Sequence, residues 1–167
     1  MEDFAWRVSV ADIDENADFS EFNGVDRIIT LIHGNDITLN FDHGQQHLLK
    51  PFEPFPFKGE HKLKAVLHQG GVRDLNLMMS RKHVSGSLIS VREATEIACD
   101  PTCFYWLFCP TGHWQVKSET NKQSSVWELN ALDYLRFDLS LTQVSLKPVT
   151  ADSAVLVATI QPGAHTE

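Results

Sequence analysis

Several features that mark particular classes of protein are missing from this 167-residue sequence. It contains no run of about 18 uninterrupted apolar residues, so we expect no membrane-spanning helix. Its three cysteines are an odd number and too few for a disulfide scaffold. The N-terminus has neither a basic segment nor a long apolar one, as a secretion signal would. These absences predict a reduced, cytoplasmic protein.

Positive charge is also scarce, with 14 Lys and Arg against 22 Asp and Glu and a net charge of −8. Partners rich in phosphate need a basic surface, so we expect the protein to bind neither nucleic acid nor a membrane. The acidity is uneven, because residues 1–22 carry −6 and the remaining 145 residues carry only −2. The nearly neutral body still allows a small anionic ligand.

The usual signatures of catalytic and metal sites are absent as well. There is no GxSxG, P-loop or GxGxxG motif, and none of the eight histidines belongs to an HxH or HExxH motif. His43 and His47 are four residues apart, but they flank a turn, where that interval does not define a face. Cys99, Cys103 and Cys109 lack paired CxxC spacing and fit buried small hydrophobic residues better than zinc ligands. We therefore expect no cofactor and no metal.

What the sequence does contain is apolar residues with a period of two, typical of β-strands. Short strands are expected at 27–33, 36–41, 63–67, 72–80, 87–91, 103–109, 114–117, 127–129, 134–139 and 154–160. Gly34-Asn35 predicts a β-hairpin between the first two. The only helix considered, at 90–98, lacks a continuous apolar stripe and is disfavoured. The strand at 103–109 is apolar on both faces, which favours two β layers or two adjoining barrels.

Two segments are harder to explain by packing alone. Residues 51–57, PFEPFPF, contain three prolines, so we expect a stiff, extended segment outside any sheet ladder. Its phenylalanines fit either the core or an interface, or else a pocket wall. In the strand at 72–80, Asp74, Asn76 and Met78 share one face. Burying an unpaired carboxylate costs several kcal/mol, so that face must meet solvent or a polar cavity.

Three motifs around these segments resemble the HutD/Ves family of cupin-like proteins. They are F-x-G-x-D-R at 22–27, P-F-x-P-F-x-F-x-G-[DE] at 51–60 and V-x-D-F-N-x-M-x-x-R at 72–81, where Leu75 replaces the usual Phe. Residues 6–11 also resemble the family's opening strand. The likeness covers roughly residues 4–82 and is weak beyond them.

The resemblance implies an all-β, cupin-like (RmlC-like jelly roll) double barrel, or bicupin, without the histidine metal motif of ordinary cupins. The chain 1–167 would form a single compact unit with an N-terminal lobe of about 1–95 and a C-terminal lobe of about 96–160. The family is associated with histidine utilisation and stress response. The motif positions that the resemblance assigns to a ligand pocket are Asp26, Arg27, Phe55, Phe57, Asp74, Asn76 and Arg81.

These residue types suit a small carboxylated metabolite such as formylglutamate or urocanate. An arginine can donate two parallel hydrogen bonds to a carboxylate, and an amide such as Asn76 can pair with a formyl or imidazole group. By strand parity, Arg81 faces away from Asn76 unless a bulge intervenes. With no catalytic constellation visible, we expect a sensor or modulator.

Two alternatives remain open. One is a cofactor-free isomerase or hydrolase in which Asp74 is the general base and Arg27 or Arg81 polarises the substrate. The other is an interaction module without a ligand. A homodimer is compatible with the sequence, which does not specify the oligomeric state.

Overall fold

The computed structural model describes residues 4–163, and every regular element in that range is a β-strand. The chain forms two compact units, one that ends at Ser85 and includes Gly163, and one that comprises Gly86–Pro162. The sequence predicts the corresponding boundary at about residue 95. Among the described residues, no helix has the length and apolar character needed to cross a membrane.

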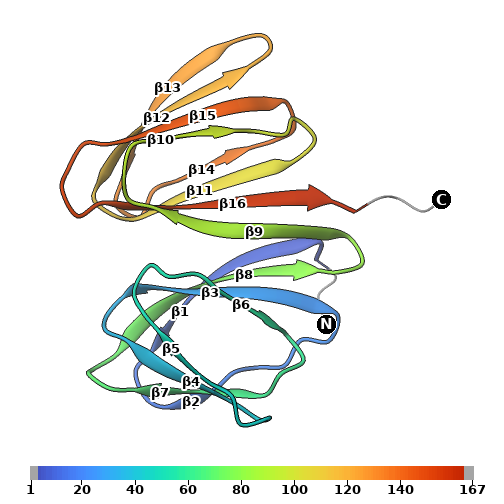
Figure 1. Ribbon diagram of the computed structural model, residues 1–167, viewed down its shortest axis with the longest axis vertical. Coiled ribbons are helices and arrows are strands. Elements are labelled where there is room, and N and C mark those ends of the chain that lie inside the picture. Colours follow the sequence, from blue (N-terminus) through green and yellow to red (C-terminus); the bar gives the residue numbers. More distant parts are fainter. Residues whose placement is uncertain (1–3, 164–167) are drawn as a thin grey trace. The chain divides into compact units, whose positions relative to one another are not determined.

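The N-terminal unit consists of two four-stranded sheets (Figure 1). One sheet has the order β1-β8-β3-β6 and the other β2-β7-β4-β5, with antiparallel pairing in both. This order is that of a jelly roll. The strands are β1 (Trp6–Ile13), β2 (Ala17–Asp18), β3 (Val25–His33), β4 (Ile37–Phe41), β5 (Gln46–Leu49), β6 (Phe55–Lys58), β7 (Leu63–Leu67) and β8 (Val72–Ser80).

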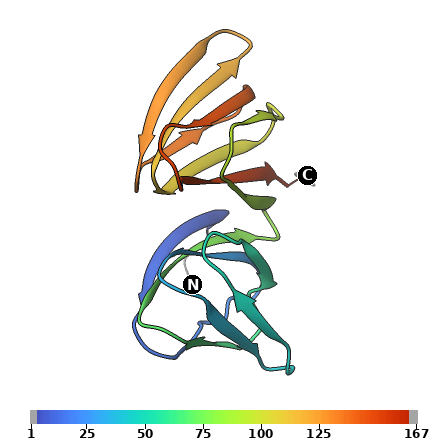
Figure 2. The same ribbon diagram turned by 60° about the vertical axis from the view of Figure 1, so that its left-hand side comes forward.

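The C-terminal unit repeats this topology (Figure 2). Its sheets have the orders β14-β11-β16-β9 and β10-β15-β12-β13, so each strand number exceeds that of its N-terminal counterpart by eight. The structural repeat has no visible counterpart in the sequence. The strands are β9 (Val84–Val91), β10 (Thr95–Ala98), β11 (Phe104–Thr111), β12 (His113–Thr120), β13 (Ser124–Asn130), β14 (Tyr134–Phe137), β15 (Leu141–Pro148) and β16 (Ala154–Pro162).

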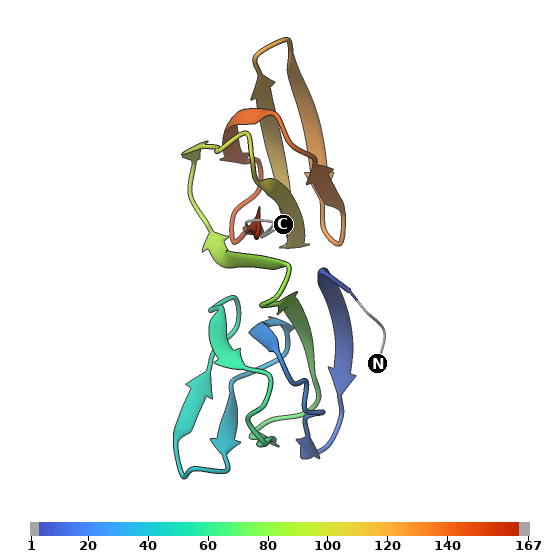
Figure 3. The same ribbon diagram turned by 90° about the vertical axis from the view of Figure 1, so that its right-hand side faces the viewer.

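The alternating pattern of β4 shows how the N-terminal core is built. Ile37, Leu39 and Phe41 are buried, whereas the residues between them are partly exposed. Strand β4 is therefore apolar on the face that packs on the facing sheet. Figure 3 shows the two sheets of this unit facing one another.

The three cysteines are buried in the C-terminal unit and form no disulfide, which confirms their prediction as small hydrophobic residues. Burial raises the pKa of the Cys109 thiol to about 11. A thiol with so high a pKa is protonated at neutral pH and is a poor nucleophile.

The predicted hairpin at Gly34-Asn35 is wrong, although the turn exists. Gly34 has a φ of +95°, as a glycine-dependent turn requires. The strands on either side belong to different sheets, because β3 pairs with β6 and β8, while β4 pairs with β5 and β7. A turn signal is local, and it does not specify whether the chain stays in its sheet.

The expectation for the proline-rich segment is also corrected. Phe55–Lys58 forms strand β6 and pairs with β3, with Phe57 opposite Arg27 and Pro56 opposite Ile28. Strand β6 is the edge of its sheet, and an edge strand tolerates a proline because one side of the strand needs no ladder hydrogen bonds. Residues 95–98, within the disfavoured helix, form strand β10.

Candidate functional site

The candidate site is built from inward-facing side chains on three neighbouring strands of the N-terminal unit. Strand β8 pairs with β1 on one side and β3 on the other, so residues opposite one another form rows across the sheet. Three rows result: Arg7, Met78 and Arg27; Ser9, Asn76 and Ile29; and Ala11, Asp74 and Leu31.

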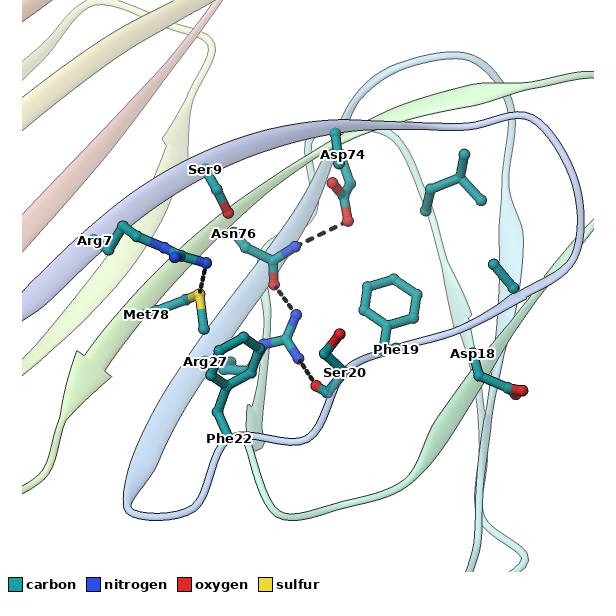
Figure 4. A pocket seen from close by; sticks show the side chains of 13 residues that line it. Arg7, Ser9, Asp18, Phe19, Ser20, Phe22, Arg27, Asp74, Asn76 and Met78 are labelled. Atoms are coloured by element: carbon teal, nitrogen blue, oxygen red, sulfur yellow. Dashed lines mark hydrogen bonds between the residues drawn. The ribbon is translucent and has the colours of Figure 1, made fainter. Parts of the chain in front are cut away.

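A cavity of about 250 Å³ opens over these rows. The segment after β2 covers part of it with two phenylalanines and a serine (Figure 4). The full lining consists of Arg7, Ser9, Ala11, Ile13, Ala17, Asp18, Phe19, Ser20, Phe22, Arg27, Asp74, Asn76 and Met78.

Arg27 is the central cation of this cavity and is only 5% exposed. Its Nη1 donates to the Ser20 carbonyl oxygen at 2.9 Å, and its Nη2 donates to Asn76 Oδ1 at 3.0 Å (Figure 4). The rings of Phe19, Phe22 and Phe57 lie 5.5, 5.4 and 4.8 Å from the guanidinium carbon, within cation–π range. Burial lowers the pKa of Arg27 to about 10, so the side chain remains charged at neutral pH.

Asp74 is the buried acid of the cavity, with 1% exposure. Asn76 joins it to Arg27, because the amide Nδ2 donates to Asp74 Oδ2 at 2.9 Å. Burial raises the pKa of Asp74 to about 6, while the charge of Arg27 and the Asn76 hydrogen bond oppose that rise. The carboxyl therefore changes protonation state not far below neutral pH.

A second arginine reaches the cavity from β1. Arg7 Nη2 donates to Met78 Sδ at 3.5 Å, and its guanidinium carbon lies 5.4 Å from the ring of Phe4 and 5.8 Å from that of Phe22. A thioether is only a weak acceptor, so this arginine is poorly paired.

Three polar atoms around the cavity are buried without a hydrogen-bond partner among residues 4–163: Arg7 Nε, Arg27 Nε and Asp74 Oδ1. Such atoms are rare in folded proteins, and each costs about 1–3 kcal/mol. The site thus offers both donors and an acceptor to a small polar molecule.

The structure brings together Arg27, Asp74 and Asn76 from the seven residues expected in the pocket. Phe57 contacts Arg27 but does not line the cavity. Phe55 stacks on His47 with ring centroids 3.7 Å apart and also lies outside the lining.

Asp26 and Arg81 lie elsewhere, in an exposed ion cluster with Glu60. Arg81 Nη1 donates to Asp26 Oδ1 at 2.9 Å, and Arg81 also pairs with the Glu60 carboxylate. These contacts lower the pKa of Glu60 to about 2, chiefly through the hydrogen bond from Arg81. Adjacent residues of a strand point to opposite faces, so Asp26 cannot share the inward face of Arg27.

Sequence reasoning missed Arg7, Ser9 and the segment at 19–22. Strand β1 carries apolar residues at Trp6, Val8 and Val10, and its opposite face, which includes Arg7 and Ser9, lines the cavity. The usable signal was the likeness of residues 6–11 to the family's opening strand.

The sequence of this chain is similar to those of several known proteins. A protein named Ves from Citrobacter koseri is 35% identical over 129 residues, covering 75% of this chain and 66% of that protein. An uncharacterised 21.2 kDa protein in the region 3′ of hutC in Pseudomonas putida is 41% identical over 78 residues, covering 47% of this chain and 41% of that protein. The chain spans between 40% and 66% of the length of the curated relatives it matches.

Solved structures show the same fold. HutD from Pseudomonas fluorescens SBW25 has a TM-score of 0.80 at 27% identity, covering 96% of this chain and 81% of that one. A cupin 2 conserved barrel domain protein from Leptotrichia buccalis has a TM-score of 0.61 at 5% identity, covering 98% and 86% of the two chains. The predicted cupin-like, all-β fold is therefore confirmed. The family model described as HutD matches residues 1–156, and the chain belongs to the HutD family.

Proposed function

We propose that this chain is a cytoplasmic small-molecule-binding protein that senses or modulates a carboxylated metabolite in histidine utilisation, such as formylglutamate or urocanate. The observation that carries the proposal is the polar cavity of the N-terminal unit, where two arginines meet a buried acid and amide. The position of the Pseudomonas putida relative near hutC and the family membership support the pathway.

The cavity suits a small carboxylate for two reasons. Its volume of about 250 Å³ lies just below the range of about 300–1,000 Å³ typical of pockets for drug-sized ligands, which favours a compact metabolite. Arg7 and Arg27 each hold a buried, unpaired Nε–H, and a ligand carboxylate would satisfy such donors. Asp74 Oδ1, also unpaired, would accept from an imidazole or formamide N–H.

Isothermal titration calorimetry with formylglutamate, urocanate, glutamate and histidine tests this proposal. We expect Arg7→Gln and Asn76→Ala to weaken binding of the preferred ligand by at least about tenfold, because each removes a polar partner from a desolvated site. Arg81→Gln is the matched control, since Arg81 lies outside the cavity, and should leave the affinity within about twofold. If the wild-type chain binds none of the four compounds, the proposal is wrong.

One observation favours a second candidate, a cofactor-free enzyme. The pKa of about 6 at Asp74 is close to that of a general base working near neutral pH. Arg27 would then polarise the substrate, since Arg81, the other arginine considered for this role, does not line the cavity. Following each compound by NMR in the presence of the protein separates the two functions. Product formation that Asp74→Asn abolishes supports the enzyme, and binding without product formation supports the sensor.

A further inference from the structure

A second cluster of reactive side chains lies outside the cavity, where two loops of the N-terminal unit meet. Asp42 and His43 belong to the turn between β4 and β5, and His61 belongs to the loop between β6 and β7. One ligating atom from each of the three residues lies within 4.8 Å of the others. None of the three lines the cavity, so the cluster is a separate feature.

The backbone holds these two loops together. Asp42 N donates to the Lys62 carbonyl oxygen at 3.0 Å, which ties one loop directly to the other. Within the turn, Phe41 N donates to the Gln45 carbonyl oxygen at 2.9 Å, and Gly44 N donates to that of Phe41 at 3.0 Å. The proximity of the three side chains therefore rests on hydrogen-bonded backbone and not on side-chain rotamers alone.

The ring of Phe41 positions both imidazoles. It is 7% exposed, and its centroid lies 5.5 Å from that of His43 and 5.9 Å from that of His61. The two imidazole centroids are themselves 5.0 Å apart. Asp42 and His43 are exposed and His61 is half-buried, so an ion in solution can reach the cluster.

We propose that Asp42, His43 and His61 form a surface site for a divalent transition metal of the zinc type. Two imidazole nitrogens and one carboxylate oxygen suit Zn²⁺, whereas Mg²⁺ and Ca²⁺ prefer oxygen ligands throughout. Three protein ligands leave a tetrahedral ion one position for water or for a donor from another molecule.

The geometry needs only a modest adjustment to bind the ion. Metal–ligand distances of about 2.0–2.1 Å place the ligands of a tetrahedral zinc ion about 3.4 Å apart. Reaching that separation from the present limit of 4.8 Å requires a movement of a little over about 1 Å. Rotation of the exposed Asp42 and His43 side chains supplies such a movement, with His43 exchanging its present contacts to Asp42 Oδ1 at 3.3 Å and Gln45 Oε1 at 3.1 Å.

The test uses the full chain without an affinity tag, treated with a chelator and dialysed, then titrated with zinc chloride at about pH 7.5, because protons compete with metal for the ligands at lower pH. We expect one zinc ion per chain, with His43→Ala and His61→Ala each weakening its binding by at least about tenfold. Absorption of the Co²⁺-substituted protein reports the same site independently.

His68→Ala is the matched control, because His68 is another histidine of this unit that pairs with Thr38 and lies outside the cluster. Its zinc affinity should equal that of the wild type, and excess Mg²⁺ should not compete. Unfolding curves of all variants confirm that they are folded. The proposal is wrong if the wild type binds no zinc, or if folded His43→Ala and His61→Ala variants bind it as tightly as His68→Ala does.

Discussion

The two units of this chain have the same strand order but different interiors. In the N-terminal unit, the paired central strands β3 and β8 carry Arg27, Asp74 and Asn76 into a cavity. In the C-terminal unit, the corresponding pair, β11 and β16, places Leu107 opposite Val157 within an apolar cluster. One topology thus supports a polar site in one case and a close-packed core in the other.

This difference shows that the shared strand order does not determine the function, which depends on the side chains that face the interior. A jelly roll requires apolar residues on its inner faces, and the C-terminal cluster meets that requirement throughout. The N-terminal unit also has an apolar cluster, part of which lines the cavity, and it adds buried charged groups whose unpaired polar atoms lower its stability unless a ligand pairs with them. Function in this family therefore has to be argued from the cavity and not from the fold.

The largest test introduces a polar group into the apolar interior. Val157, 2% exposed, becomes Asn, and we expect the free energy of unfolding to fall by about 4 kcal/mol, because apolar burial is lost and an amide is left unpaired. Val126→Asn, at a position 60% exposed in the same unit, should change stability by less than about 0.5 kcal/mol. Equal losses in urea unfolding would mean that position 157 is no more sensitive to a polar group than the surface, so the C-terminal interior is not a close-packed apolar core.

The second test removes the buried acid of the N-terminal unit. Because its folded pKa of about 6 exceeds the unfolded value of 3.8, Asp74 favours the folded state at low pH, and that contribution is lost as the pH rises through this interval. From about pH 4 to pH 6.5, wild type should therefore lose up to about 3 kcal/mol relative to Asp74→Asn.

Urea unfolding across that range, with Asp138→Asn as a control at an exposed position, measures the difference. Parallel curves for wild type and Asp74→Asn would show that this carboxyl has an ordinary pKa.

The smallest test concerns the surface of the same unit. Arg81 is about one-third exposed, and Arg81→Gln disrupts its pairs with Asp26 and Glu60. We expect a loss below about 1 kcal/mol that shrinks as salt is added, because exposed ion pairs are weak and screened. A larger loss of stability that does not change with salt would indicate that the ion cluster of Asp26, Glu60 and Arg81 behaves as buried groups do, like those of the cavity.

The alternation of Asp74, Asn76 and Met78 allowed the sequence to predict a polar face on β8, with a cavity as one of two interpretations. In the structure that face lines a cavity, because β1 extends it on one side and the segment at 19–22 covers part of it. Arg7 was missed because its sequence neighbours do not show which face of strand β1 points into the cavity. That depends on the pairing of β1 with β8. The cluster of Asp42, His43 and His61 was missed because its members converge from two loops, whereas the expected metal motifs have closely spaced ligands.

By itself, the sequence determined the all-β class, most of the strands and the polar face of β8, since period-two patterns and turn residues act over a few neighbours. Only the tertiary structure decided which strands pair and which side chains meet. Arg7 and Met78 are 71 residues apart along the chain, yet they lie in contact because β1 adds to the edge of β8 in one register. No local pattern encodes that register. It depends on which side chains of the two paired strands become buried when the strands align.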